Sequence, residues 1–310
     1  MTGGSGFIGP HVISALATTY DSVVSADLID PPPQNLEVLL DRSSRVEFVR
    51  ADVTDLVKML ELVKAKGVKE IVHLARGVSP ARLASKVNID STLQLLEIAR
   101  LTDIRKLLFV GTSMAYGLRK DMQPISEQDP VDPQDPYAVT KFAAERLGFY
   151  YNRTYGLDFR VVRLSSIYGP LYPFQTEKGL RPFSLGETLQ SVIQNKPVKF
   201  GKGGDYVRDY TYVKDAVAGL ALLIKAEKLP YSLYNVSSGR NYSLKEVFET
   251  IREIVPSANL QIDDGVFDGF DRTLRGPLDI TRIKALGFMP AYSLRDGLEE
   301  YISWLRKHSY

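Results

Sequence analysis

The sequence predicts a doubly wound α/β fold, in which helices cover both faces of a parallel sheet. Along the first half of the chain, short apolar runs rich in β-branched residues alternate with segments whose apolar residues recur at helical spacing. A strand buried on both faces has to be apolar throughout, and parallel neighbours need a crossover between them, usually a helix. This alternation therefore indicates a parallel sheet whose ligands bind at the carboxyl ends of the strands.

The expected elements follow from these patterns. In the first half the strands are expected at 22–26, 46–50, 70–74, 106–110 and 159–164, and the helices at 10–20, 56–66, 81–100 and 136–155. After Gly169 the composition changes, because residues 170–182 are rich in proline, glycine and aromatic residues, as in a loop that closes over a ligand. Further helices are expected at 185–195, 213–226, 244–255 and 294–307, with strands at 198–200 and 231–236.

A length of 310 residues favours two lobes. The strand expected at 231–236 would return to the main sheet, so the lobes should be interleaved. We predict that residues 1–164 and 205–236 form the lobe with the parallel sheet. A smaller, C-terminal substrate-binding lobe would consist of residues 165–204 and 237–310.

Composition excludes several kinds of chemistry. The chain has no cysteine, so disulfides, thiolate metal sites and a cysteine nucleophile are excluded. Its three histidines (His11, His73 and His308) have no HxxxH spacing, and we expect no metal site. The net charge of +2 gives no reason to expect nucleic acid or anionic lipid as a partner. No apolar run approaches the roughly 20 residues of a membrane span and no signal peptide precedes the first motif, so we expect no membrane association and a cytoplasmic location.

Residues 2–9, TGGSGFIG, have the spacing GxxGxxG and lead directly into the first expected helix. Gly3 would permit a tight turn, Gly6 would let the backbone approach a pyrophosphate, and Gly9 would allow close packing of helix and sheet. The amides at the start of the helix favour negative charge. The motif is typical of a Rossmann dinucleotide site, although a glycine-rich turn without a ligand is the alternative.

Two aspartates follow the next two expected strands. Asp27 is placed where a carboxylate accepts hydrogen bonds from the adenosine ribose and repels a 2′-phosphate, which favours NAD over NADP. Asp52 either binds the adenine amino group or is a solvated loop residue, and the sequence favours neither role over the other.

The first strand of such a fold should precede the glycine motif, yet only Met1 stands before Thr2. That strand would form the centre of the sheet, and its neighbours would otherwise have unpaired backbone groups. We expect either that residues upstream supply it or that another segment fills its place.

The candidate chemistry lies in Tyr137 and Lys141, which are four residues apart in an expected helix and so share one face. A tyrosine with a pKa near 10 is a poor base at neutral pH, but a neighbouring ammonium stabilises its phenolate. By itself YxxxK is a weak signal. Thr112 and Ser113 strengthen it, because they follow the strand expected at 106–110, at the edge of the sheet where such folds bind substrates.

Together these motifs resemble the extended short-chain dehydrogenases/reductases, and among them the chain is similar to the UDP-glucose 4-epimerases of the NAD-dependent epimerase/dehydratase family. The resemblance runs nearly end to end. It rests on TGGSGFIG at 2–9, HLA at 73–75, NIDSTLQLLEIAR at 88–100, GTSMAYG at 111–117, PYAVTKFAAE at 136–145, RLSSIYGP at 163–170, VKFGKGGDYVRDYTYVKDA at 198–216, YNVSSG at 234–239 and LDITRIKALGFMP at 278–290.

The resemblance implies a role for each matching residue. Thr112 matches the catalytic Ser/Thr, with Ser113 as the alternative; Tyr137 matches the acid/base, and Lys141 the residue that binds the nicotinamide ribose and tunes that tyrosine. The positions implied to bind the cofactor NAD are Gly3, Gly6, Phe7, Ile8, Gly9, Asp27, Asp52, Val53, Leu74, Ala75, Asn88, Tyr137 and Lys141. Those implied to bind a substrate are Ser113, Ser166, Phe200, Arg208 and Arg275.

Arg208 would pair with a nucleotide diphosphate, for which the geometry of a guanidinium is suited, and Phe200 would lie against a nucleobase. The alternatives are an ion pair of Arg208 with Asp209 or Asp215, and a core role for Phe200. The second phosphate-binding arginine is either Arg272 or Arg275.

The chain also departs from the family pattern. Ser166 stands where the epimerases usually have Asn, and Arg76, in a shortened loop, either binds a substrate carboxylate or faces solvent. Related dehydratases and decarboxylases carry an acidic residue directly after the catalytic Thr/Ser. Here Ser113 and Met114 follow Thr112, which disfavours those activities.

The leading hypothesis is therefore a nucleotide-sugar 4-epimerase, which oxidises C4 to a ketone and reduces it again on the opposite face. One alternative is a dehydrogenase or reductase of a sugar, sugar acid or small hydroxy acid; another is a non-catalytic NAD sensor. By analogy with the family, the helices at 81–100 and 136–155 would pair in a homodimer.

Overall fold

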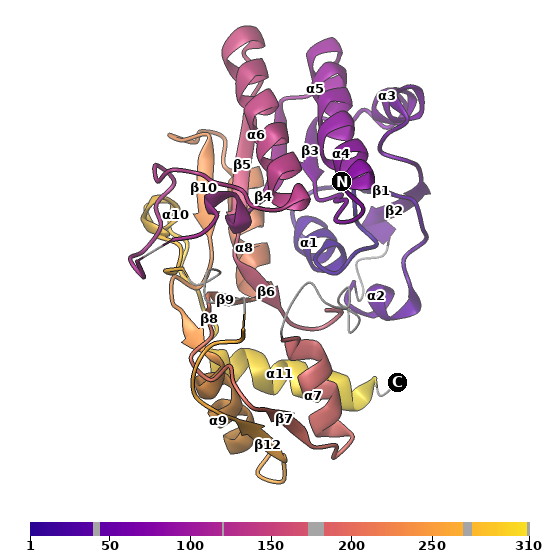
Figure 1. Ribbon diagram of the computed structural model, residues 1–310. Helices are drawn as coiled ribbons and strands as arrows, with labels where there is room; N and C mark the ends of the chain where they lie inside the picture. The colour runs from indigo at the N-terminus through magenta and orange to yellow at the C-terminus, as the bar shows by residue number, and fades with distance from the viewer. Residues whose placement is uncertain (40–43, 120, 173–182, 269–274, 309–310) are drawn as a thin grey trace. The chain divides into compact units, whose positions relative to one another are not determined.

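The structure, a computed structural model, describes residues 1–39, 44–119, 121–172, 183–268 and 275–308, and it divides into two units (Figure 1). Unit 1 comprises Met1–Gly117, Glu127–Leu164 and Val217–Val236, and unit 2 comprises Leu118–Ser126, Ser165–Ala216 and Ser237–Tyr310.

Unit 1 contains the predicted parallel sheet. Its strands are β1 (Val23–Asp27), β2 (Val46–Arg50), β3 (Glu70–His73), β4 (Lys106–Thr112), β5 (Phe159–Leu164) and β10 (Leu233–Val236). β1 pairs with β2, and the other four form a ladder in the order β10-β5-β4-β3, all in parallel. Thr2 joins the two ladders, because it bridges Ala26 and His73 in parallel. Met1 and Thr2 thus occupy the position that the sequence analysis assigned to a missing first strand.

The helical elements that contribute to unit 1 are α1 (Gly9–Leu16), α2 (Pro33–Glu37), α3 (Leu56–Ala65), α4 (Ala81–Ser85), the π-turn η2 (Lys86–Asp90), α5 (Ser91–Leu101), the 3-10 turn η3 (Ser113–Tyr116), α6 (Pro136–Tyr155) and α8 (Val213–Lys225), whose first turn belongs to unit 2. Apolar side chains of α3, α5 and α6 pack together with those of β3, β4 and β5. The single helix expected at 81–100 is wrong, because η2 interrupts it. The other long helices and the strands are confirmed to within a few residues at each end.

Unit 2 consists of shorter elements. They are β6 (Ser166–Tyr168), α7 (Leu185–Ile193), β7 (Val198–Phe200), β8 (Val207–Arg208), β9 (Tyr210–Tyr212), β11 (Tyr242–Ser243), α9 (Leu244–Ile254), β12 (Leu260–Ile262), α10 (Thr281–Lys284) and α11 (Leu294–Lys307). The pairs β6–β9 and β7–β12 are parallel, and β8–β11 is antiparallel. Most of the loop predicted at 170–182 lies outside the described residues.

The unit boundaries differ from the predicted lobes in two segments. Residues 205–216 were expected with the main sheet, but β9 pairs with β6 in unit 2. Residues 118–126 also belong to unit 2, because Ile125 bridges Leu278. Both pairings join segments far apart in the sequence, which local patterns do not reveal.

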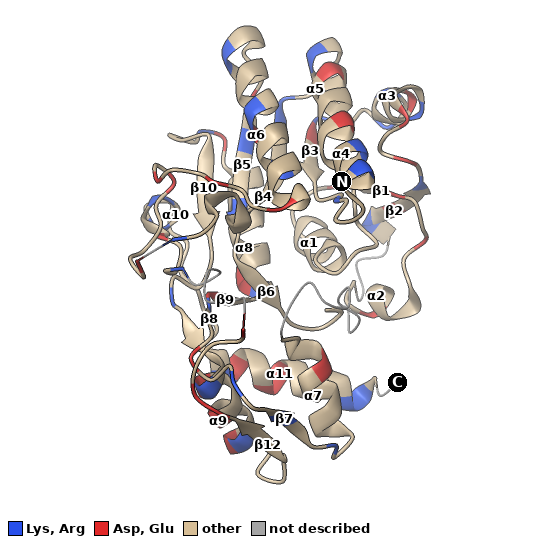
Figure 2. Ribbon diagram, viewed as in Figure 1, with Lys and Arg blue, Asp and Glu red and all other residues tan. Residues whose placement is uncertain are grey.

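Basic and acidic side chains are interspersed along the helices in the view of Figure 2. No helix within the described ranges has both the length and the apolar composition required to cross a membrane. In the same ranges, no group of three or more His, Asp and Glu side chains is arranged to hold a metal ion.

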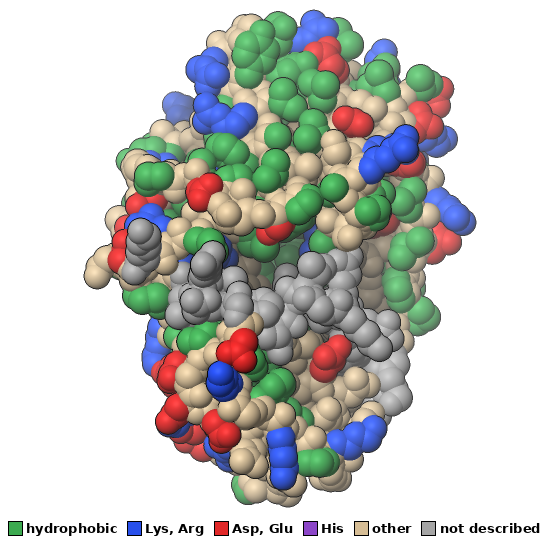
Figure 3. Space-filling view, in the orientation of Figure 1, with side chains coloured by type: hydrophobic (Ala, Val, Ile, Leu, Met, Phe, Trp, Pro, Cys, Tyr) green, Lys and Arg blue, Asp and Glu red, His purple; other side chains and the backbone are tan. Residues whose placement is uncertain are grey.

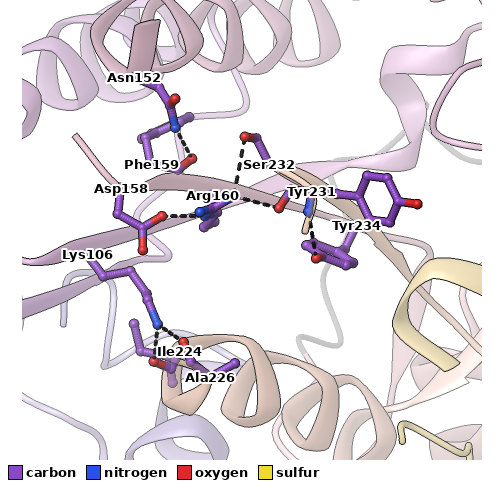
Figure 4. Close-up of polar contacts among 10 residues, drawn as sticks. All are labelled: Lys106, Asn152, Asp158, Phe159, Arg160, Ile224, Ala226, Tyr231, Ser232 and Tyr234. Carbon is purple, nitrogen blue, oxygen red and sulfur yellow. Dashed lines mark hydrogen bonds and ion pairs between the residues drawn. The ribbon is translucent and has the colours of Figure 1, made fainter. Parts of the chain in front are cut away.

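Polar contacts tie together the amino ends of β4, β5 and β10 (Figure 4). Lys106, only 6% exposed, donates through Nζ to the carbonyl oxygen of Ile224 at 2.9 Å and to that of Ala226, at the end of α8. Arg160 pairs with Asp158 and donates to the carbonyl oxygen of Tyr231 at 2.7 Å. The buried ammonium of Lys106 thus donates to carbonyl groups that the end of α8 leaves without helical partners. Its positive charge is also favourable at the carboxyl end of a helix dipole.

Replacing Lys106 with Met keeps the stem but removes this donor, so we expect the free energy of unfolding to fall by about 1–3 kcal/mol. Urea denaturation measures the change. Lys69→Met is the control, because Lys69 forms an exposed pair with Asp103 and its loss should cost at most about 1 kcal/mol. Equal losses in the two variants would contradict the capping role.

Candidate active site

The glycine turn between Thr2 and α1 has the geometry of an anion-binding cradle. Gly3 has φ +76°, and a Cβ there would lie 2.6 Å from the Ala75 nitrogen. At Gly6 a Cβ would meet nothing closer than a carbonyl oxygen at 3.5 Å, so the space above that backbone is open. Ile8, the N-cap of α1, makes no side-chain capping bond. Because the first amides of a helix have no helical partners, the turn offers donors beside an open approach, as a pyrophosphate requires.

The turn itself also requires a glycine at position 9. A Cβ at Gly9 would lie 2.4 Å from the carbonyl oxygen of Gly4 and 2.7 Å from that of Gly3. The nearest clashes are therefore with the backbone of the turn itself. Gly4 is also close-packed, since a Cβ there would lie 1.9 Å from the side-chain oxygen of Ser25.

Asp27 ends β1 with its carboxylate over the glycine turn, where it accepts hydrogen bonds from the Ser5 amide at 2.9 Å and the Leu28 amide at 2.7 Å. Asp52 makes a tighter local arrangement, because the amide and the hydroxyl of Thr54 both donate to one oxygen, at 2.8 and 2.7 Å. Burial opposes ionisation of Asp52, but these hydrogen bonds outweigh it and lower its pKa. Both hydrogen bonds are to Oδ1, and they do not decide between its two predicted roles.

Lys141 is the central polar group of unit 1. Its side chain is 1% exposed, and Nζ donates to the carbonyl oxygens of Val110 at 3.0 Å and Ala75 at 3.3 Å, above the Phe109 ring. Burial, together with the positive charge of Arg76, lowers the pKa of Lys141 to about 7, while Glu145 opposes this shift. Tyr137, half-buried, lies one turn earlier, at the start of α6.

Ala75 links the two halves of the site. Its nitrogen lies against Gly3, where there is no room for a Cβ, and its carbonyl oxygen accepts from Lys141. Thr112 and Ser113 are buried at the end of β4, the strand that also contributes Val110, and Thr112 Oγ1 accepts from the Met114 amide at 3.2 Å. The fold thus joins the glycine turn to the Tyr–Lys helix. It places the Thr112 hydroxyl on a strand that this helix contacts, and the Ser113 hydroxyl directly after that strand.

Asn88 is buried, and its side chain makes hydrogen bonds within the protein. Its fully buried amide accepts from the Gly77 nitrogen at 2.9 Å and donates to the Gly77 oxygen at 2.8 Å and to Thr140 Oγ1 at 2.9 Å. The π-turn η2 carries Asn88, as π-bulges often do at functional sites. Asn88 therefore fixes the loop after Ala75 to α6. Arg76, in that loop, is exposed.

His73 is buried beneath this loop, with Nδ1 2.6 Å from Thr2 Oγ1 and Nε2 3.1 Å from Ser91 Oγ. Burial, with smaller effects of Lys141 and the N-terminal amine, lowers the pKa of His73 well below 6.5. The folded state therefore keeps this ring neutral at pH values at which the unfolded chain protonates it.

We expect His73 to make stability pH-dependent. Above pH 6.5 the ring is neutral in both states, and below it the unfolded state gains a proton, so the free energy of unfolding falls by up to about 1.4 kcal/mol per pH unit. Urea denaturation between pH 7.5 and 5.5 measures the slope. His73→Gln should show a shallower slope below pH 6.5, and an unchanged slope would assign the effect to other groups.

The substrate residues predicted in unit 2 have different surroundings. Phe200 is half-buried and packs against Phe183, Phe248 and Phe267, with ring centroids 5.7–6.2 Å apart, which fits its alternative core role. Ser166 is half-buried in β6.

Arg208 and Arg275 both contact the chain at or next to β11. Arg208 stacks on Tyr206, 4.2 Å from the ring centroid, and is paired with Tyr242 across the β8–β11 ladder. The carbonyl oxygen of Arg275 accepts from Asn241 at 2.8 Å. Arg272 lies outside the described residues.

Glu145 and Arg163 form a buried ion pair that was not predicted from the sequence. A signal was present, since Glu145 follows Lys141 by four residues, as Lys141 follows Tyr137, and so lies on the same helix face. Its partner is on β5, and the sequence offers no comparable hint of it.

The Rossmann sheet, the glycine turn and the linked Tyr–Lys helix define an enzyme of the extended short-chain dehydrogenase/reductase type. The profile of the NAD-dependent epimerase/dehydratase family matches residues 1–237, and the chain belongs to that family.

Individual relatives are similar along their whole length. The chain is 27% identical to a protein named putative UDP-glucose 4-epimerase from Methanocaldococcus jannaschii, over 100% of this chain and 98% of the relative. It is 28% identical to a UDP-glucuronate 4-epimerase from Thermodesulfobacterium geofontis, over 99% and 96%. The crystal structure of UDP-glucose 4-epimerase from Thermotoga maritima with UDP-glucose superimposes with a TM-score of 0.87 at 28% identity, covering 100% and 98% of the two chains.

Proposed function

We propose that this protein is an NAD-dependent 4-epimerase of a nucleotide sugar. The observation that carries the proposal is the linkage through Ala75, which holds a buried lysine of the Tyr137–Lys141 pair against the glycine turn. A dinucleotide lying along that turn, with its pyrophosphate over Gly6, would have its nicotinamide end near Lys141. When bound, NAD would supply the hydride acceptor and donor for the sugar carbon.

The residues of the chain would then handle the proton. Lys141 would contact the nicotinamide ribose and stabilise the phenolate of Tyr137, which takes the proton of the C4 hydroxyl and later returns it. The Thr112 hydroxyl, with Ser113 as the alternative, would hold the reacting oxygen. Asp27 would accept from the adenosine ribose. The keto-sugar turns between the two half-reactions, so no second base is needed.

The nucleotide would be held in unit 2, where Arg208 and Arg275 offer cations for a diphosphate. A dehydratase or decarboxylase role is disfavoured because Ser113 and Met114 stand where those relatives carry an acid. The dehydrogenase alternative keeps the same residues in unit 1, and it is favoured by Ser166 and by the exposed Arg76 beside Lys141.

The test is incubation of the purified protein with UDP-glucose, UDP-glucuronate and UDP-N-acetylglucosamine, each analysed for its C4 epimer. Epimer formation without net NADH is the expected result. Steady accumulation of NADH with a sugar or hydroxy acid would instead support the dehydrogenase. Interconversion of none of these pairs would refute the proposal.

We also propose a homodimer formed through α5 and α6. Leu93, Leu101, Val139 and Tyr150 on these helices are 37–60% exposed. In Figure 3 hydrophobic side chains gather over this part of unit 1. Exposed apolar surface of this kind marks an interface, and a two-fold pairing would cover it. Light scattering should give twice 34.7 kDa, and a monomer mass at micromolar concentration would contradict it.

A further inference from the structure

A buried ion pair lies one turn along α6 from Lys141, and its two residues have no part in the proposed reaction. Glu145, one turn further along α6, has no exposed surface, and Arg163 on β5 is 3% exposed. Arg163 Nη2 donates to Glu145 Oε2 at 2.7 Å, and Nε lies 3.2 Å from both carboxylate oxygens. Two charges are therefore held together, out of water, on the helix face that presents Tyr137 and Lys141.

The surrounding strands shape a place for this pair. Gly111 on β4 leaves room for the carboxylate, because a Cβ there would lie 2.6 Å from Glu145 Oε1. The guanidinium of Arg163 stacks on Tyr116, 4.5 Å from the ring centroid, and the Tyr116 hydroxyl donates to Asn235 Oδ1 at 2.8 Å. Burial raises the pKa of Glu145, while the positive charge and the hydrogen bonds of Arg163 oppose that shift and favour the carboxylate.

Stability alone is a poor explanation of this arrangement. Desolvating two charges costs several kcal/mol per ion, and apolar residues of similar volume often replace a buried pair without loss. Arg163 Nη1 is also buried without a hydrogen-bond partner among the described residues. A role of the charge other than stability therefore explains the buried pair better.

Lys141 is the neighbouring group that needs a negative charge. The charged or titratable groups that act on it are Arg76 in the loop after β3, His73 on β3 and Glu145 on α6, while β4 contributes the Val110 carbonyl. His73 is neutral, and Arg76 repels an ammonium. Of the charged groups named here, Glu145 is the one whose charge favours the protonated lysine.

We propose that Glu145 is a positioning residue for the chemistry of Tyr137: clamped by Arg163, it supplies the buried negative charge that keeps Lys141 an ammonium. The catalytic consequence rests on the proposed function, whereas the ionisation of Lys141 is a property of the protein itself. The two can therefore be tested separately.

The first experiment follows the titration of Lys141 by NMR in protein labelled at lysine side chains, with Lys141→Met to assign the signal. Glu145→Gln keeps the shape and one acceptor for Arg163 but removes the charge. We expect the titration midpoint of Lys141 to fall by about one pH unit or more. Arg76→Leu should raise the titration midpoint of Lys141. If Glu145 had a purely structural role, the two substitutions would not shift the midpoint in opposite directions.

A matched control is Glu47→Gln, which removes a carboxylate from the exposed pair with Lys66 and should leave the midpoint unchanged. If Glu145→Gln does not fold, the double variant Glu145→Leu/Arg163→Met decides, because replacing both charges by apolar side chains preserves folding in other proteins. Its Lys141 midpoint should also fall. If the variant that folds has the same Lys141 titration midpoint as the unaltered protein, the inference is overturned.

The second experiment measures the pH dependence of kcat for epimerisation. Since Tyr137 requires a charged Lys141, the alkaline limb of the profile should move to lower pH in Glu145→Gln, by as much as the lysine midpoint moves, with KM little changed. If the unaltered protein epimerises no nucleotide sugar, the proposed function fails, and the titration still decides the role of Glu145. An unmoved alkaline limb in an active variant overturns the inference.

Discussion

Replacing Tyr137 with phenylalanine is expected to lower kcat by about 10²–10⁴-fold and to leave folding unchanged. The ring, half-buried at the start of α6, keeps its packing, and only the hydroxyl that exchanges the proton is lost. Epimerisation is measured together with retained nucleotide and the midpoint of thermal unfolding.

Tyr231→Phe is the matched control, because Tyr231 is 43% exposed and lies outside α5 and α6, just before β10. We expect it to retain full activity. Should Tyr137→Phe epimerise at the rate of the unaltered protein, Tyr137 is not the acid/base. If neither the unaltered protein nor Tyr137→Phe shows activity, and the two bind NAD equally, the hypothesis of a non-catalytic NAD sensor gains support.

The second large effect is expected at the glycine turn, where Gly3→Ala should abolish NAD binding and destabilise the fold. The new Cβ would lie 2.6–2.9 Å from backbone atoms of Leu74 and Ala75, at φ +76°, and neither the backbone contact nor the dihedral angle relaxes easily. Strain of this kind costs about 1–3 kcal/mol, and the clash adds to it. Displacing Ala75 would also remove an acceptor of Lys141.

Gly6→Ala separates binding from folding. Its Cβ meets no atom closer than 3.5 Å in the protein, so the free energy of unfolding should change by less than about 0.5 kcal/mol. The added methyl group fills the approach expected for the pyrophosphate, so NAD affinity should fall at least tenfold. Urea denaturation and NAD titration by calorimetry measure the two effects. Unchanged affinity in Gly6→Ala would place the pyrophosphate elsewhere.

Much of the fold could be predicted because its signals are local. The strands of the main sheet are apolar runs flanked by helical periodicity, and the three glycines of the GxxGxxG spacing lie within seven residues. The interruption at η2 could not be predicted in this way, because periodicity over 81–100 is continuous and the π-turn accompanies an Asn88 amide bonded to Gly77 and Thr140. The assignment of β9 to unit 2 likewise depends on a pairing with β6 some 40 residues earlier.

The candidate site shows the same division. The sequence by itself determined the fold class, the cofactor-binding motif and the pairing of Tyr137 with Lys141, because each depends on spacing within one turn or one helix. Only the tertiary structure decided that Ala75 joins the turn to Lys141, that Gly9 is needed by the turn, and that Glu145 faces Arg163. Those contacts depend on backbone approach and on the burial of charge between separate strands, which only the assembled sheet brings about.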